Sequence, residues 1–391
     1  MASTFDTGVD RRGTACIKWD FQEVDYGKSG LLPFSIADAD WPTCPAVLDA
    51  LKRRVDNGVI GYTDVSPNYL SAVADWCMRR HSWKVDPEWI VPTGGIVPAI
   101  CDALEALTAP DAQVVVQPPV YDPFYSVIRA SGRRQVDNPL LLDDSGYHMD
   151  YEGLERACQE GAAALILCSP HNPVCRVWTR EELSRLADLC ARYGLLVISD
   201  EIHWDLVLGG REHVTLGQFP QLYDKLIVCT SCSKSFNVAG LDTSNLIIPG
   251  QATRSAFRDY LFARYLFCPN ALGMVATQAA YEGGEAWLEE ALAYLTQNAA
   301  VVRDFLAARL PKVRMAEPQG TYLMWFDLRA YGLPSEELVR LIADAGAGLN
   351  AGVHYGRDYD GFVRMNIACP RAQLLAGLEC VEQALNAIEA S

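Results

Sequence analysis

The sequence predicts an α/β fold, in which a mostly parallel sheet with flanking helices forms a large domain and a smaller α+β domain follows. Short apolar runs bounded by turn residues predict buried strands at 113–117, 164–168, 195–199, 226–230 and 245–249. Amphipathic helical patterns alternate with these runs, which is typical of parallel strands joined by helices. After residue 284 this alternation gives way to a different pattern.

Residues 179–194 carry the start and stop signals of an amphipathic helix. Thr179 is the expected N-cap, Glu182 is its capping-box partner, and Gly194 ends the helix. The apolar stripe between these ends consists of Leu183, Leu186, Leu189, Cys190 and Tyr193. Because strands are predicted on both sides of it, this helix would join two strands of the parallel sheet.

The C-terminal part predicts a separate unit. Its pattern predicts a long helix at 285–310, a strand at 320–328, a helix at 335–347 and a strand at 362–369. A final helix follows residue 369. We therefore divide the chain into an N-terminal segment, 1–45, that packs with the small domain, a large domain, 46–284, and a small α+β domain, 285–391.

Composition excludes several classes of function. A formal net charge of −16 argues against nucleic acid and anionic membrane surfaces as partners. No apolar run is long enough to span a bilayer and no secretory signal is visible, so we expect a cytoplasmic protein. The 13 cysteines, an odd number in a large chain, favour reduced thiols over a disulfide framework. The six histidines form no metal-binding pattern, so no metal is expected.

Polar side chains follow the predicted strands directly. The carboxyl ends of parallel strands meet at one edge of a sheet, where ligands bind. The residues expected there are Tyr121, Asn172, Asp200, His203, Ser231, Ser233 and Lys234. Lysine is seldom placed beside a core for packing, so Lys234 is either a snorkelling side chain or an amine that loses its proton and forms a Schiff base.

The stretch TGGIVPAI, at 93–100, places two glycines before a predicted helix with Pro98 in its first turn. Free N–H groups at a helix start bind anions, although an ordinary turn fits the same pattern. Pyridoxal phosphate (PLP) would use the whole set of residues. Its aldehyde needs a lysine, its ring nitrogen an acid, its phosphate a helix start with hydroxyl groups, and its ring a flat partner.

Several longer stretches match a known family. They are DRRGTACIKWD, LPFSIADADWP, GYT, SPHNPVCRVWTREEL, ISDEIHWDLV, SKSFNVAGL and FVRMNIACPR, and they extend to about residue 371. In them the chain closely resembles the MalY/PatB-type cystathionine β-lyases, which are C–S lyases within the class I/II aminotransferase superfamily. The resemblance implies the fold-type I PLP-dependent transferase fold. It also implies cleavage of L-cystathionine and related S-substituted cysteines to a thiol, pyruvate and ammonia.

Position by position, the resemblance implies a role for each residue of the site. Lys234 forms the Schiff base and is catalytic together with Tyr121, which also stacks on the cofactor ring, and Asp200 pairs with the ring nitrogen. The remaining cofactor-binding residues that it implies are Gly95, Ile96, Val97, Asn172, His203, Ser231, Ser233 and Tyr62. Arg364 is expected to hold the substrate α-carboxylate, with Asn172 and Tyr62 beside it. Tyr62 would reach the neighbouring subunit's cofactor, which implies a homodimer.

One departure from the wider superfamily bears on the reaction. Many aminotransferases carry a phosphate-binding arginine eight residues after the lysine, and this position is Asp242 here. The lyase branch also tends to lack that arginine, so Asp242 favours a lyase. The alternative is a PLP-dependent aminotransferase, which would use the same cofactor-binding residues. Considered without the family resemblance, each of three residues also has a structural explanation. Arg364 could be a surface arginine on a strand, Tyr62 could pack in an interface, and His203 could only support Asp200.

Overall fold

The large sheet contains every strand predicted between residues 113 and 249. Within the residues that the computed structural model describes, 3–267 and 269–390, it has seven strands in the order β2-β10-β9-β8-β7-β3-β4. Their bounds are β2 (Ile90–Thr93), β3 (Gln113–Val116), β4 (Arg134–Asp137), β7 (Ala162–Cys168), β8 (Leu196–Asp200), β9 (Leu226–Thr230) and β10 (Ser244–Ile247). The strands from β4 to β9 in this order are parallel, so the mostly parallel sheet is confirmed.

Strand β10 differs from the others because it runs antiparallel to both neighbours, β9 and β2. The connection from β9, residues 231–243, contains only a short 3₁₀ turn and no crossover helix, which a parallel neighbour would require. The residues that precede β10 therefore reach the same edge of the sheet as the residues that follow the parallel strands.

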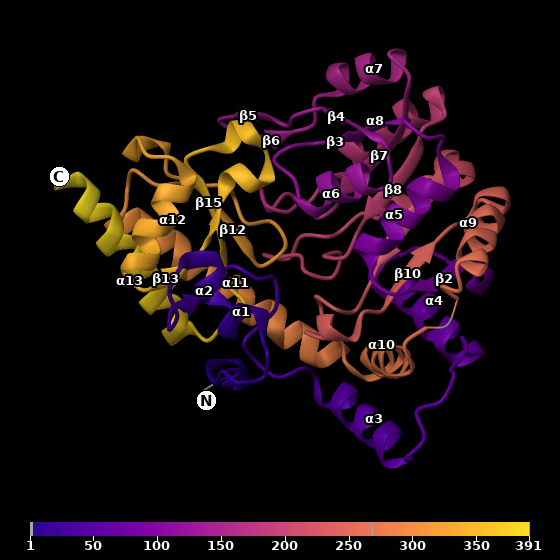
Figure 1. Cartoon of the computed structure of the whole chain (residues 1–391), viewed down its shortest axis with the longest axis horizontal. Coiled ribbons are helices and arrows are strands. Elements are labelled where there is room, and N and C mark those ends of the chain that lie inside the picture. The colour runs from indigo at the N-terminus through magenta and orange to yellow at the C-terminus, as the bar shows by residue number, and fades with distance from the viewer. Residues whose placement is uncertain (1–2, 268, 391) are drawn as a thin grey trace.

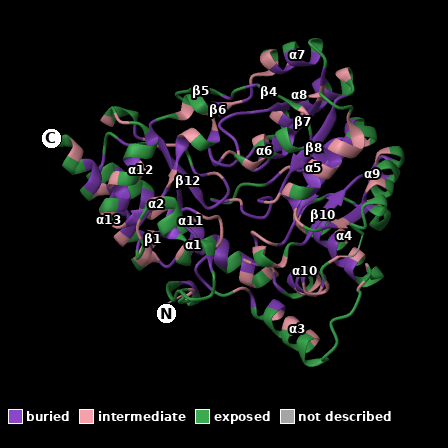
Figure 2. Ribbon diagram, viewed as in Figure 1, coloured by how far each residue is buried: buried purple, intermediate pink, exposed green. Residues whose placement is uncertain are grey.

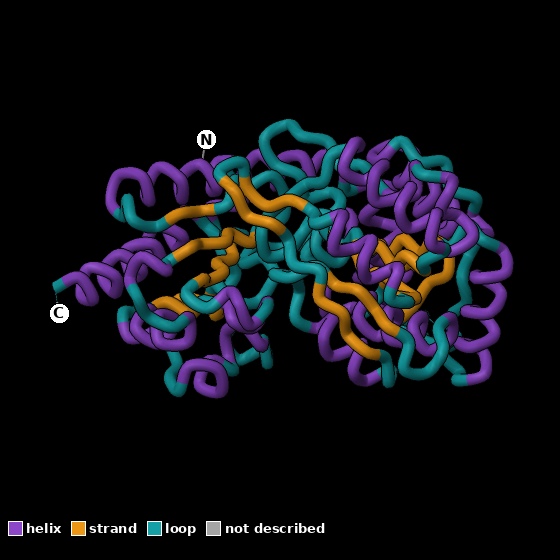
Figure 3. Tube along the Cα trace, turned by 90° about the horizontal axis from the view of Figure 1, so that it is seen from above, coloured by secondary structure: helices purple, strands orange, loops and turns teal. Residues whose placement is uncertain are grey.

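Helices cover both faces of this sheet, as Figure 3 shows from above. One face packs on α5 (Ile96–Leu107), α6 (Pro123–Ala130) and α9 (Gln251–Ala263). The other packs on α4 (Pro67–His81), α7 (Tyr151–Gln159), α8 (Arg180–Tyr193) and α10 (Ala271–Gly283), with α3 (Pro45–Asp56) beside α10. Strand residues alternate between the two cores, and in Figure 2 the central strands are buried while the outer helices expose one side.

The helix predicted at 179–194 forms with the expected signals at both ends. The Thr179 side chain accepts a hydrogen bond from the Glu182 N–H, and the Glu182 carboxylate accepts one from the Thr179 N–H. Gly194 has a left-handed backbone with φ of 66°, which glycine adopts without strain. This capping box and glycine stop explain why the sequence located α8 to within a residue.

The C-terminal part forms its own sheet, in the order β11-β12-β15-β14. Its elements are α11 (Glu285–Arg309), β11 (Arg314–Met315), β12 (Leu323–Asp327), α12 (Ser335–Asp344), β13 (Ala347–Gly348), β14 (Asn350–Ala351), β15 (Phe362–Asn366) and α13 (Arg371–Glu389). A separate hairpin, β5 (Leu141–Asp143) with β6 (Gly146–His148), extends from the large-sheet half of the chain.

The N-terminal segment lies against this C-terminal part. Strand β1 (Leu32–Pro33) pairs in parallel with β13, with Leu32 opposite Ala347. Figure 1 shows the indigo helices α1 (Ile17–Asp20) and α2 (Gln22–Tyr26) beside the orange and yellow α12 and α13. These contacts agree with a segment that packs on the small domain, while the boundaries at residues 45 and 284 remain predictions.

Candidate active site

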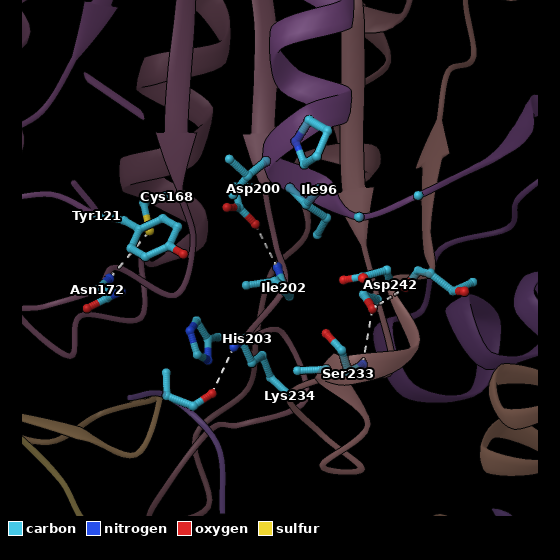
Figure 4. Close-up of a pocket in the computed structure, with 18 residues that line it drawn as sticks. Ile96, Tyr121, Cys168, Asn172, Asp200, Ile202, His203, Ser233, Lys234 and Asp242 are labelled. Carbon is cyan, nitrogen blue, oxygen red and sulfur yellow. Dashed lines mark hydrogen bonds between the residues drawn. The ribbon is translucent and has the colours of Figure 1, made fainter. Parts of the chain in front are cut away.

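A cavity of about 360 Å³ lies at the edge where the parallel strands of the large sheet end. Figure 4 shows the side chains that converge on it from the ends of several strands. The predicted residues that line it are Gly95, Ile96, Val97, Tyr121, Asn172, Asp200, His203, Ser231, Ser233 and Lys234. Two other predicted site residues, Arg364 and Tyr62, do not line this cavity.

Lys234 occupies the turn after β9 and extends into the cavity (Figure 4). Its Nζ donates a hydrogen bond to the carbonyl oxygen of Ala37, at 2.8 Å, and the Tyr322 hydroxyl donates to the same oxygen at 3.0 Å. Burial lowers the pKa of the Lys234 amine, and the positive charge of Arg364 lowers it further, against the opposing effect of Asp38. A lowered pKa gives this amine a larger neutral fraction, which suits a nucleophile or a proton acceptor.

Asp200 ends strand β8 and is buried at the wall of the cavity. Among the described residues, the N–H of Ile202 donates to its Oδ1, at 3.1 Å. Burial raises the pKa of Asp200 to about 7, although the Ile202 N–H and Lys234 favour its charged form. The carboxyl group therefore lacks a strong partner, and a protonated ring nitrogen facing it would supply one.

The start of α5 forms another part of the cavity wall. Gly95 precedes the helix with a φ of 100°, and within the described chain no side chain caps the helix start. The first N–H groups of α5, from Ile96 and Val97, are therefore available to an anion. The Ser231 hydroxyl donates to Thr243 O at 2.7 Å and accepts from the Ser233 N–H at 3.1 Å, while its contact with a cofactor stays a prediction. Ser231 thus shapes the turn before Lys234.

Arg364 lies on β15 and is 5% exposed, which excludes a surface arginine. Its Nη1 donates to Asn172 Oδ1 at 3.2 Å, and its Nη2 donates to Ser35 O at 2.5 Å and to Asn350 Oδ1 at 2.8 Å. Its Nε is buried and has no partner among the described residues. Through Asn172, which lines the cavity, Arg364 adjoins the site with its Nε–H unused.

Two ring side chains beside the cavity are held neutral. Burial raises the pKa of Tyr121 to about 12, so that its hydroxyl keeps its proton at neutral pH. Burial, Lys234 and Arg364 together lower the pKa of His203 to about 3, so that its imidazole is uncharged. His203 also packs edge-on against Tyr322, with ring centroids 5.8 Å apart.

Tyr62 is fully exposed on the connection between α3 and α4. Within one chain it therefore makes no part of the cavity wall. Its predicted role depends on a second subunit, which a single chain does not test.

Several lining residues were not predicted. Thr243 lines the cavity because β10 is antiparallel and begins at this edge, whereas site residues were sought after the strands; Asp242, which stands where many aminotransferases have a phosphate-binding arginine, lies beside it. Ala37 contributes a backbone carbonyl, which every residue type has, so no side-chain pattern indicates it. Cys168 and Ile202 belong to the strand ends already identified. They were not predicted because only polar side chains were selected there.

The raised pKa of Asp200 predicts a pH-dependent stability of the cofactor-free protein. A carboxyl whose folded pKa is raised stabilises the fold below the unfolded pKa and loses that contribution as the pH rises through the folded value. We expect the free energy of unfolding of the wild type, relative to Asp200→Asn, to fall by roughly 4 kcal/mol between pH 4 and pH 8. Urea titrations across this range measure the difference, and a difference independent of pH would contradict the assignment.

The residues present fit PLP on structural grounds. The uncapped start of α5 suits a phosphate, the weakly partnered carboxyl of Asp200 suits a ring N–H, and the Lys234 amine suits an aldehyde. Tyr121 stands across the cavity as a flat partner (Figure 4). Asp242 also lines the wall, and a carboxylate repels an anion. The phosphate would therefore be bound by the start of α5 and by Ser233.

Comparisons with known proteins identify the family of the chain. The family model for aminotransferase class I and II matches residues 29–380. The chain is 41% identical to cystathionine beta-lyase PatB of Bacillus subtilis, over 98% of this chain and 100% of PatB. It is 34% identical to MalY of Escherichia coli, over 98% of this chain and 99% of MalY.

Solved structures give the same result. Cystalysin from Treponema denticola, which contains a pyridoxal 5'-phosphate cofactor, superposes with a TM-score of 0.95 at 33% identity, covering 99% of this chain and 100% of that one. The PLP-bound C-S lyase from Staphylococcus hominis superposes with a TM-score of 0.92 at 31% identity, covering 98% of each chain. The predicted resemblance is thereby confirmed, and the chain belongs to the aminotransferase class I and II family.

Proposed function

We propose that this protein is a PLP-dependent C–S β-lyase. It cleaves L-cystathionine and related S-substituted cysteines to a thiol, pyruvate and ammonia, and the thiol from cystathionine is homocysteine. The observation that carries the proposal is the convergence of Lys234, Asp200 and the start of α5 on one cavity. The similarity over nearly the whole chain to proteins named as β-lyases supports the choice of reaction.

PLP would be held by groups from every side of the cavity. When bound, it supplies an aldehyde that forms a Schiff base with amines and a ring that accepts electrons from a substrate carbanion. Ile96, Val97 and Ser233 would bind its phosphate, Asp200 would keep its ring nitrogen protonated, and Tyr121 would cover one face of the ring. Asn172 would contact its ring hydroxyl, and neutral His203 would lie close by.

Arg364 would orient the substrate. Its planar guanidinium is fixed by Asn172, Asn350 and the Ser35 carbonyl, and a carboxylate could take up the unused Nε donor. Binding the α-carboxylate here fixes which bonds at Cα face the catalytic lysine.

Lys234 would move the proton. With cofactor and substrate bound, the Lys234 amine, whose pKa is lowered by burial, would be able to remove the Cα proton. The Ala37 carbonyl then accepts a hydrogen bond from the resulting ammonium group. The Tyr121 hydroxyl, which keeps its proton, could donate a hydrogen bond to the departing thiolate. The aminotransferase alternative would use the same residues but would leave the C–S bond intact.

Pyruvate release tests this function directly. Purified protein with PLP and L-cystathionine, but no keto-acid acceptor, should release pyruvate continuously with an equal amount of free thiol. No pyruvate, together with a cofactor spectrum that shifts to the amine form and recovers with a keto acid, would refute the lyase and establish an aminotransferase.

We further propose that the active unit is a homodimer in which Tyr62 reaches the site of the neighbouring subunit. The connection between α3 and α4 exposes Val59, Ile60 and Tyr62. The connection between α9 and α10 exposes Tyr265, Leu266 and Phe267. Exposed apolar side chains in such number are typical of surfaces that a protein partner covers.

Mixed dimers give a sharp test of the shared site. Lys234→Ala and Tyr62→Ala subunits should each be weakly active alone, because each lacks one residue in every site. Refolding them together in equal amounts should restore about a quarter of wild-type activity, since half of the dimers then hold one complete site. If Tyr62 acts only within its own subunit, mixing will restore nothing.

A cytoplasmic location is our proposal for this protein. The described cysteines are free, including Cys229 and Cys232, which are spaced as Cys-x-x-Cys. Free thiols in this number are typical of a protein in a reducing compartment. Among the described residues, helices that combine the length and apolar character needed to cross a membrane are absent.

A further inference from the structure

A buried carboxylate lies behind the wall of the cavity, outside the site described above. Asp205 follows Asp200 and His203 on the same segment and is 3% exposed. Its Oδ1 accepts hydrogen bonds from Trp76 Nε1 at 3.1 Å and from His81 Nε2 at 3.0 Å. Its Oδ2 accepts one from the Ser235 hydroxyl at 2.7 Å. Such a set of donors is what a buried carboxylate anion requires.

The surroundings keep Asp205 charged and fixed. Burial opposes the charge more strongly than any single partner favours it, but the hydrogen bonds from His81 and Ser235, together with nearby positive charge, hold the pKa of Asp205 below its ordinary value. The His81 ring stacks on Trp204, with centroids 3.9 Å apart and an interplanar angle of 15°. Burial also lowers the pKa of His81, so the imidazole serves as a neutral donor at neutral pH. Asp205 is therefore a rigid acceptor for Ser235.

Ser235 is the residue directly after Lys234. We propose that Asp205 and Ser235 are positioning residues, which fix the turn that carries Lys234 relative to Asp200. The bond between them ties the segment after β9 to the segment after β8, and these two segments supply the lysine and the carboxyl of the site. Asp205 acts through this bond and not as a charge, since the charges that affect the Lys234 amine are Asp38, Arg364 and Asp200.

A second buried carboxylate in the same region provides a matched comparison. Glu201 accepts from the Ser199 hydroxyl at 2.9 Å, from the Leu216 N–H at 3.0 Å and pairs with His213 at 2.8 Å. Both pairs join a buried serine to a buried carboxylate beside a histidine. Of these two pairs, the Asp205 pair includes a residue of the turn that carries Lys234. A comparison of Ser235→Ala with Ser199→Ala therefore separates an effect on the position of Lys234 from a general loss of stability.

The experiment compares Ser235→Ala, Ser235→Thr and Ser199→Ala with the wild type. It measures the rate at which PLP forms a Schiff base with cofactor-free protein, followed by absorbance, together with kcat, KM and the thermal midpoint. Ser235→Ala should slow Schiff-base formation about 10-fold and lower kcat by about 10- to 100-fold at nearly constant KM, because a small displacement of a reacting group costs this much. Ser235→Thr, which keeps the hydroxyl, should recover most of both rates.

Ser199→Ala should lower the thermal midpoint comparably and leave Schiff-base formation unchanged. If Ser235→Ala forms the Schiff base at the wild-type rate, or if Ser199→Ala slows it equally, the positioning role is refuted. Should Ser235→Ala not fold, Asp205→Asn supplies the same comparison, with a smaller expected loss. The inference rests on the proposed role of Lys234, and wild-type protein that forms no Schiff base with PLP would overturn that role instead.

Discussion

Replacing Lys234 by alanine should reduce turnover by at least about 10³-fold, since the loss removes a general base that typically contributes 10²- to 10⁴-fold and also the Schiff-base amine. The lysine is the amine that the structure places in the cavity with Asp200, where it donates a hydrogen bond to Ala37 O. Initial rates of pyruvate release measure the effect. The absorbance of the Schiff base should disappear in the same variant.

Chemical rescue distinguishes a lost base from a damaged fold. A small primary amine such as ethylamine can occupy the space that the side chain leaves, so it should restore part of the rate in proportion to its concentration. Lys225→Ala is the matched control, because Lys225 Nζ also donates to a backbone carbonyl, Gly194 O at 2.7 Å, but on the surface. Wild-type turnover in Lys234→Ala would refute the assignment of this lysine.

Replacing Arg364 by alanine should raise KM for amino-acid substrates on the order of 100-fold, or about 2.7 kcal/mol, while kcat changes much less. The guanidinium is buried and held by three acceptors, so its loss removes a prepared carboxylate site and leaves Asn172 and Asn350 without their donor. Steady-state kinetics with L-cystathionine measure both constants.

Two further variants separate geometry from charge. Arg364→Lys keeps a cation but loses the planar fork, so KM should remain raised by about 10-fold or more. Arg371 is the matched control, because its guanidinium lies 5.1 Å from the Tyr294 ring much as that of Arg364 lies 5.0 Å from the Tyr355 ring. Arg371→Ala should leave KM unchanged, and an unchanged KM in Arg364→Ala would remove Arg364 from the site.

The fold could be predicted wherever local chemistry decides it. The strands of the large sheet that are apolar on both faces, and helix α8 with its capping box, were located correctly because burial and capping depend on residue type. Strands β2 and β4 were missed. The first contains Pro92, and the second, at the edge of the sheet, is largely exposed, so neither shows the apolar run of a buried strand.

The site also contains residues that the sequence predicts and residues that only the tertiary structure reveals. Lys234, Asp200 and the glycines before α5 could be predicted because their side chains or backbone freedom are unusual for their positions. The direction of β10 could not be predicted, since it depends on the length of a connection and not on residue type, and the placement of Thr243 was missed with it. The burial of Arg364 required the tertiary structure, and the role of Tyr62 requires a second subunit.

The pairing of β1 with β13 determines when the reactive centre can be completed during translation. Asn366 donates to the carbonyl oxygens of Ile36 and Asp38, at 2.6 and 2.7 Å, on both sides of the Ala37 carbonyl that Lys234 uses. Residues 32–38 are synthesised long before their partners Ala347 and Asn366. A nascent chain therefore contains both Lys234 and Ala37 before it contains Asn366, which binds the carbonyl groups on both sides of Ala37, and contacts this distant in sequence form late. The surroundings of the Lys234 amine are accordingly incomplete until residue 366 has been synthesised.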